Sequence, residues 1–122
     1  MPIVDVDLVE TEGQARPAGL ARALADRLGA FWGMPSGRVW VRLSFRAADA
    51  YAENGIDAAA TPAPVFATIL HAHLPDADGL AREAGNLART ISEVVGCHAD
   101  RVHVVYAPPG AGRVAFGGAL VR

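Results

Sequence analysis

The sequence predicts an α+β (α/β) fold, in which two tandem β-α-β units form a four-stranded mixed sheet with two helices on one face. Three observations predict it. Apolar residues alternate with polar ones in short segments, which is typical of strands. Two longer segments repeat apolar residues at helical spacing, one in each half of the chain. Finally, Pro64 follows Pro2 by 62 positions, and the segment RVHV at 101 follows RVWV at 38 by 63, which indicates an internal duplication.

The first unit covers residues 2–46. Residues 2–10 alternate as a strand, and residues 38–46 alternate more strictly as a second strand. One face of this second strand carries Arg38, Trp40, Arg42, Ser44 and Arg46. A helix is predicted over 14–31, where large apolar residues recur three and four positions apart, with Pro17 in the first turn. These apolar residues are Leu20, Leu24, Leu28 and Phe31.

The second unit covers residues 64–107. Its predicted strands are 64–74, which is apolar and β-branched, and 101–107, and its predicted helix covers 78–95. The two strands of a β-α-β unit are parallel. Two units side by side leave one sheet face without helices, and that face carries apolar and long side chains such as Trp40. We expect oligomerisation to cover it.

Two segments lie outside the units. Residues 47–63 are rich in alanine and contain Asn-Gly, and we interpret them as a long connection, a type of segment that often carries function. Residues 108–122 form a turn rich in proline and glycine, followed by one short terminal strand made by VAFGGALV.

Composition limits the functional classes. The chain has 122 residues, of which 52% are hydrophobic, and a formal net charge of −2. These values fit a single globular domain over 1–122, without the basic patch of a nucleic-acid-binding protein. Cys97 is the only cysteine, so no intrachain disulfide forms. The first residues, MPIVDVDLVE, lack the basic region of a signal peptide, and no apolar stretch has the length of a membrane span. We therefore expect a cytoplasmic protein with no nucleic-acid or membrane partner.

The MPIV start, the duplicated β-α-β unit and the segment AFGG at 115–118 together resemble the tautomerase superfamily. Segment 100–118, DRVHVVYAPPGAGRVAFGG, is similar to the C-terminal region of the macrophage migration inhibitory factor (MIF) family. The chain also resembles the 5-carboxymethyl-2-hydroxymuconate isomerase family and two fused copies of a 4-oxalocrotonate tautomerase subunit. The resemblance covers nearly the whole chain and implies a tautomerase (MIF-like) fold.

The resemblance also implies a homotrimer whose sheets enclose a central barrel, with an active site at each subunit boundary. The catalytic base of such a protein is the amine of an N-terminal proline, which is Pro2 here once Met1 is removed. The two substrate-binding arginines of 4-oxalocrotonate tautomerase fall on other residue types in this sequence. One falls on Glu12, and the other falls on Trp40 in the first half and His103 in the second.

The chemistry of Pro2 supports this assignment. An ordinary α-amine has a pKa of about 8. Burial and cationic neighbours lower such a pKa, because both disfavour the ammonium form. A base that is neutral near pH 7 is what abstraction of a proton beside a carbonyl requires.

Five further residues are candidates for substrate contacts. In the resemblance, His103 corresponds to a residue that reaches into a neighbouring subunit's active site, and Phe116 corresponds to an apolar pocket wall. Tyr51 falls at the equivalent place of the first half. Arg42 and Arg46 are candidates for binding a carboxylate, which arginine does with two parallel hydrogen bonds.

His71 and His73 end the third predicted strand, and alternation places both on one sheet face. His73 falls where family pockets are lined, and a histidine can donate a hydrogen bond to an anion. We interpret His71 as a structural residue. The H-x-H spacing also fits a metal site, but no carboxylate or cysteine completes a ligand set. We expect no metal and no other cofactor.

The leading interpretation is therefore a tautomerase in which Pro2 moves a proton on a small anionic enol or 2-keto acid. Two alternatives stay open. In one, a protonated Pro2 acts beside a water molecule in hydration, dehalogenation or decarboxylation. In the other, the chain is a non-enzymatic trimeric binding protein with a vestigial pocket.

Overall fold

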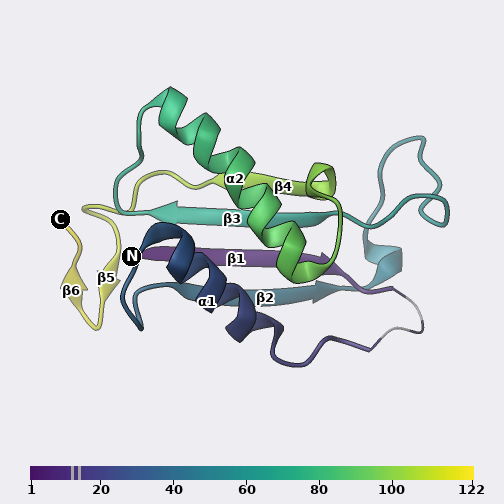
Figure 1. Cartoon of the computed structure of the whole chain (residues 1–122), viewed down its shortest axis with the longest axis horizontal. Coiled ribbons are helices and arrows are strands. Elements are labelled where there is room, and N and C mark those ends of the chain that lie inside the picture. The colour runs from purple at the N-terminus through teal and green to yellow at the C-terminus, as the bar shows by residue number, and fades with distance from the viewer. Residues whose placement is uncertain (12, 14) are drawn as a thin grey trace.

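Two helices lie on one face of a four-stranded sheet (Figure 1). The computed structural model describes residues 1–11, 13 and 15–122. The described residues include two short 3-10 helices, η1 (Ala48–Ala50) and η2 (Ala99–Arg101). The strands and α-helices are β1 (Pro2–Val9), α1 (Leu20–Trp32), β2 (Trp40–Arg46), β3 (Val65–His71), α2 (Ala77–Val95), β4 (Val102–Tyr106), β5 (Ala115–Phe116) and β6 (Ala119–Leu120). Within these described residues, neither α-helix is long and apolar enough to cross a membrane.

The strand order in the sheet is β2-β1-β3-β4. β1 is parallel to β2 and β3 is parallel to β4, whereas the two central strands are antiparallel to each other. Each parallel pair is connected through one helix, as a β-α-β unit requires. The predicted fold class is therefore confirmed. Because β1 and β3 are antiparallel, β1 begins at the end of the sheet where β3 finishes, and Pro2 is paired with His71.

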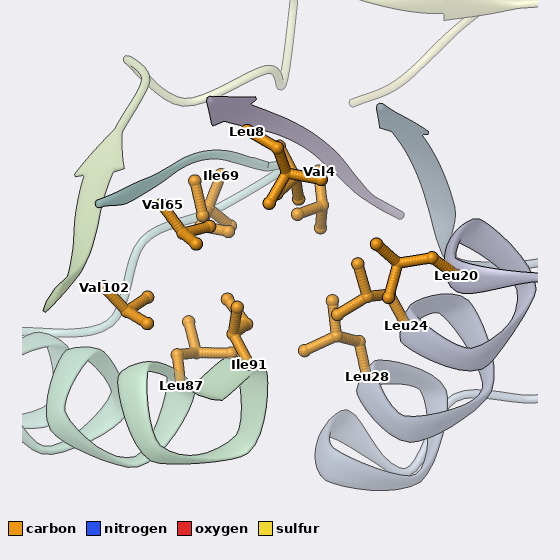
Figure 2. Close-up of a cluster of buried hydrophobic side chains, with 12 residues drawn as sticks. Val4, Leu8, Leu20, Leu24, Leu28, Val65, Ile69, Leu87, Ile91 and Val102 are labelled. Atoms are coloured by element: carbon orange, nitrogen blue, oxygen red, sulfur yellow. The ribbon is translucent and has the colours of Figure 1, made fainter. Parts of the chain in front are cut away.

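The core lies between the sheet and the two helices (Figure 2). Every second residue of β1 is buried, and the predicted leucine stripe of α1 is buried as well. The buried apolar residues are Val4, Val6, Leu8, Leu20, Leu24, Leu28, Val65, Ala67, Ile69, Leu87, Ile91 and Val102. β1 is thus paired on both edges and packed against helices on one face, so its first residue is held in place rather than frayed.

The opposite sheet face carries alternate residues of the four strands, and no described helix covers it. Two large apolar side chains on it are substantially exposed, Phe66 at 37% and Val105 at 52%. Arg42 donates to Asp5, and Arg46 donates to Asp7, across the parallel strands β1 and β2. We call this surface the open face. Its residues are Ile3, Asp5, Asp7, Val9, Trp40, Arg42, Ser44, Arg46, Phe66, Thr68, Leu70, His103 and Val105.

The first helix is shorter than predicted. It begins at Leu20 instead of residue 14, because Gly19 adopts a left-handed conformation with φ 73°, which side chains disfavour. Pro17 therefore precedes the helix instead of occupying its first turn. The second helix matches its prediction to within one residue at its start, where the Asp76 side chain accepts a hydrogen bond from the Gly79 amide.

The largest departures from the predicted strands lie in the third strand and in the terminal segment. The third strand ends at His71 instead of residue 74, since the chain bends at 72–73 to reach the cap of α2. The terminal segment 114–121 is a hairpin of β5 and β6 instead of one strand. Gly117 and Gly118 both have positive φ, 56° and 87°, and this pair reverses the chain.

Candidate active site

Pro2 opens β1 and is fully buried beneath Met1, on the helix side of the sheet. The β5–β6 hairpin lies beside this end of the sheet, whereas the 47–63 connection lies at the opposite end (Figure 1). We call the two ends the proline end and the far end. The prediction that Pro2 begins a buried strand is confirmed.

The turn after β4 closes over the N-terminus at Gly110. Its amide donates a hydrogen bond of 2.8 Å to the carbonyl of His71. A Cβ at this glycine would lie 2.6 Å from Cε of Met1 and 3.2 Å from Cγ2 of Val114. The Met1 side chain thus occupies the space between this turn and β1, and removal of Met1 would empty that space next to the Pro2 nitrogen.

A cation lies level with the N-terminus. The β1–β2 register pairs Ile3 with Trp40, so two positions earlier on both strands Met1 is level with Arg38. The pKa of the Met1 α-amine is lowered, first by burial and then by the positive charge of Arg38. Arg38 is exposed and forms no ion pair with any residue that the structure describes.

A carboxylate with three hydrogen-bond partners lies at the same end. Trp32 Nε1 donates to Glu83 Oε1 at 2.8 Å, the Tyr106 hydroxyl donates to Oε2 at 2.7 Å, and His71 Nε2 is 3.0 Å from Oε2. Burial alone would raise the pKa of Glu83, but the hydrogen bonds from Tyr106, Trp32 and His71 outweigh burial and lower it. We call these four residues the Glu83 network.

The Glu83 network fixes the imidazole of His71. An ionised carboxylate only accepts hydrogen bonds, so Nε2 of His71 carries the hydrogen. The ring packs edge-on against Trp32, with centroids 5.2 Å apart, and is stacked with Tyr106 at 6.1 Å. The His71 and Glu83 side chains are only 12% and 16% exposed. Pro2 is the cross-strand partner of His71 on the same side of the sheet, a position that places Cβ atoms about 4.5–5.5 Å apart.

Arg38 and Glu83 are site residues that the sequence patterns did not single out. Glu83 precedes buried Leu87 by one helical turn, so an acidic residue on the apolar stripe of α2 was the available signal. For Arg38 the signal was the repeated Arg-Val at the start of the second strand of each unit.

Solved structures with the same architecture are tautomerases and their relatives. A fused 4-OT described as a symmetric trimer has a TM-score of 0.74 at 18% sequence identity, and the match covers 98% of this chain and 94% of that chain. The macrophage migration inhibitory factor from Oncomelania hupensis has a TM-score of 0.70 at 22% identity, with 100% and 83% covered. The chain has the tautomerase fold.

Other tautomerase-fold structures are similar to this chain as well, among them FG41 malonate semialdehyde decarboxylase, with a TM-score of 0.64 at 16% identity over 96% of this chain and 92% of that chain. No model of a protein family matches the sequence, and no curated protein matches it. The resemblance drawn from the sequence is thus confirmed at the level of fold.

Within this tautomerase fold, the predicted substrate residues are dispersed. The ring of Phe116 is stacked on Trp40 with centroids 4.5 Å apart, next to Ile3, and lines one hollow with Arg42. Arg42 donates two hydrogen bonds to Asp5, at 2.6 and 2.8 Å, so its guanidinium already binds a carboxylate. Arg42 and Phe116 therefore lie near the first residues of β1 but on the open face, away from the Glu83 network.

The two predicted histidines occupy different surroundings. His73 is exposed and follows the last residue of β3, so strand alternation does not place it with His71. His103 points to the open face together with Val105, as predicted, and its ring lies 5.2 Å from that of Phe66. Glu12, one of the positions compared with the family arginines, lies outside the described residues. No three His, Cys, Asp or Glu residues of the described chain come together as a metal site.

Tyr51 lies at the far end of the tautomerase fold. Its hydroxyl donates to Glu53 at 2.6 Å, and Arg101 donates to the same oxygen at 2.6 Å. Arg101 also donates to the carbonyl of Pro62. These residues line a cavity of about 450 Å³ that the 47–63 connection and the last residues of β1 enclose. The structure therefore does not bring Tyr51 to Pro2 within one chain.

Proposed function

We propose that the chain is an isomerase of the tautomerase type, in which the amine of Pro2 is exposed by removal of Met1 and acts as a general base. One observation carries the proposal. The N-terminal amine lies at a buried sheet end beside Arg38, and both the burial and the cation lower its pKa. The Pro2 nitrogen is one residue deeper in the same environment, so we expect it to be a neutral base near pH 7.

The reaction is a proton transfer with no other reactant. The lone pair of the Pro2 nitrogen takes a proton from one carbon or from the enol oxygen of the substrate, and the substrate becomes an enolate. The ammonium then returns the proton to a different atom of the substrate. A small enol or 2-keto acid provides the acidic proton and the carbonyl that stabilises the enolate.

Arg38 is the residue best placed to bind the substrate's anionic group. Arg42 and Arg46 are ion-paired with Asp5 and Asp7, whereas Arg38 has no such partner among the described residues. An arginine can hold a carboxylate with two hydrogen bonds. We propose Arg38 in this role, with His73 as a further donor at the same end and Phe116 as an apolar wall.

A homotrimer would cover the open face. Phe66 and Val105 are exposed there, and Oδ1 of Asp7 is buried without a hydrogen-bond partner among the described residues. A neighbouring subunit would bury the apolar groups and supply a donor to Asp7. It would also allow His103 to reach the neighbour's active site. The fused 4-OT structures similar to this chain are described as trimers.

The chemistry with a protonated Pro2 needs a carboxylate that positions water. Glu83 is the carboxylate that the structure connects to the partner of Pro2, but both of its oxygens already accept hydrogen bonds. Its side chain is also only 16% exposed, so it is poorly placed to position water, and we favour proton transfer over hydration, dehalogenation or decarboxylation.

Three measurements test the proposal. Mass spectrometry of the intact chain should show the loss of Met1, and the processed protein should ketonise phenylenolpyruvate, a generic enol. A chain that retains Met1, or a processed chain without turnover, would favour the binding-protein alternative. Sedimentation at micromolar concentration should give the mass of three subunits, and Val105→Glu should give the mass of one because it places a charge on the open face.

A further inference from the structure

We propose that Glu83, acting through His71, is the counter-charge that stabilises the Pro2 ammonium during proton transfer. The inference rests on the proposed function of Pro2 and assigns a positioning role to residues that do not touch the substrate. The reaction creates a positive charge on the Pro2 nitrogen, and the positive charge of Arg38 destabilises that ammonium.

The geometry favours an ionised carboxylate behind His71. Glu83 accepts from Trp32 and Tyr106 at 2.8 and 2.7 Å and has His71 Nε2 at 3.0 Å. Three donors around one carboxylate stabilise its anionic form. The Tyr106 hydroxyl stays protonated, because burial and its hydrogen bond to Glu83 raise its pKa. The ionised Glu83 carboxylate therefore supplies a negative charge behind His71.

That charge lies beside Pro2 and little water screens it. His71 is the cross-strand partner of Pro2 on the same side of the sheet, and the side chains of His71 and Glu83 are both less than one fifth exposed. Interactions between charges are stronger in such surroundings than in water. The other titratable and charged groups towards this end are Arg38 before β2, His73 after β3, Arg113 in the turn after β4, and Asp76, Asp78 and Arg82 at the start of α2. Trp32 from α1 and Tyr106 from β4 contribute donors without charge.

The proton transfer then takes place between a positive group on one side and a negative group on the other. When the substrate's proton moves to the Pro2 nitrogen, one positive charge appears on the nitrogen and one negative charge on the enolate. Arg38 stabilises the enolate side, and the Glu83–His71 pair stabilises the ammonium side. The same pair holds the imidazole next to the pyrrolidine ring, because Nε2 is bound and the ring is packed between Trp32 and Tyr106.

The test compares Glu83→Gln with Glu93→Gln in the processed protein. Both residues lie on α2, but Glu93 is paired with Arg27 at the surface. Glu83→Gln should lower the Pro2 pKa by about one unit, a tenfold change in the ionisation constant. It should also lower the kcat plateau about threefold, because a weaker base takes the proton more slowly. Glu93→Gln should change neither. The Pro2 pKa is measured from the pH profile of kcat/KM and from the ¹⁵N shift of labelled proline.

His71→Gln separates charge from structure. It keeps a donor towards Glu83 and leaves the carboxylate ionised, so it should not lower the Pro2 pKa. If Glu83→Gln does not fold, Glu83→Leu removes the same charge with an apolar side chain of similar size and should lower the Pro2 pKa equally. Equal downward shifts in Glu83→Gln and His71→Gln, or no shift in folded Glu83→Gln, would overturn the inference while leaving Pro2 catalysis intact. Retention of Met1 in the intact mass would instead remove the proposed function and the inference with it.

Discussion

The proline end and the far end of the sheet correspond to each other in the repeated sequence pattern, yet they differ in the proline, in the arginine and in the Glu83 network. At an offset of 62 positions, Pro64 corresponds to Pro2, and at 63 positions Arg101 corresponds to Arg38. Pro64 is buried within the chain, where its nitrogen is an amide without basicity. Arg101 is bound by Glu53 and by the carbonyl of Pro62, whereas Arg38 is exposed beside the N-terminal amine.

The Glu83 network also exists at one end only. At the offset of 62 positions, His71 and Glu83 correspond to Val9 and Ala21, and at 63 positions Tyr106 corresponds to Leu43. The polar groups supplied by the second unit thus lie beside the proline of the first unit, and the first unit supplies no equivalent in return. The two ends of the sheet thus share strand geometry but differ in side chains, and these differences favour the proline end for the proposed chemistry.

The largest expected effect separates the two prolines. Pro2→Ala keeps an α-amine but makes it primary and more mobile, so kcat/KM on an enol should fall by about 10²–10⁴-fold while the fold and trimer persist. An N-terminal extension should abolish activity, because it converts the amine to an amide. Pro64→Ala should leave the chemistry at Pro2 unchanged. Equal rates of the Pro2→Ala and unaltered proteins would contradict the enzyme interpretation.

The next effect concerns the two histidines that the resemblance assigns to the substrate. His73→Ala and His103→Ala should each raise KM or lower kcat/KM by roughly 10–100-fold, about 1.4–2.8 kcal/mol. His103 lies on the open face, where it would act on a neighbouring subunit's site. In the monomeric Val105→Glu variant, His103→Ala should therefore cause no further loss of activity. Unchanged kinetics in the double alanine variant would contradict both roles.

The two arginines provide a smaller contrast. Arg38→Ala should raise KM about tenfold for an anionic substrate and raise the Pro2 pKa, since a positive charge is removed beside the ammonium. The acid limb of the kcat/KM profile should therefore move to higher pH. Arg38→Lys should restore the pH of the acid limb more fully than it restores KM, because lysine keeps the charge but lacks the paired donors. Arg101→Ala should leave both parameters unchanged, and a matching shift there would show that Arg38 has no special position.

Most of the fold could be predicted from the sequence because alternation and helical spacing are local signals. They specify which residues of β1, β2 and α1 face the core, and the duplication predicts the parallel pairs. The start of α1 and the terminal hairpin depend on glycine conformations, at Gly19 and at the pair after Phe116, and the end of β3 depends on the bend towards α2. Sequence spacing reports none of these. The site was predicted less completely. Pro2 was recognisable, but His71 meets Glu83 only because a strand end and a helix come together in space.

The smallest expected effect compares two tyrosines that donate to carboxylates, one at each end. Tyr106 donates to buried Glu83, and Tyr51 donates to the more exposed Glu53. Tyr106→Phe should lower the free energy of unfolding by about 1 kcal/mol at pH 7, and Tyr51→Phe should lower it less because water replaces the donor. The pKa of Glu83 is lowered in the folded state, so its stabilisation is present above the unfolded value of about 4.5 and is lost as pH falls through the folded pKa. Urea unfolding of the Tyr106→Phe and unaltered chains should therefore converge below that range. A difference that persists at lower pH would mean that Tyr106 stabilises the fold by packing and not through the charge of Glu83.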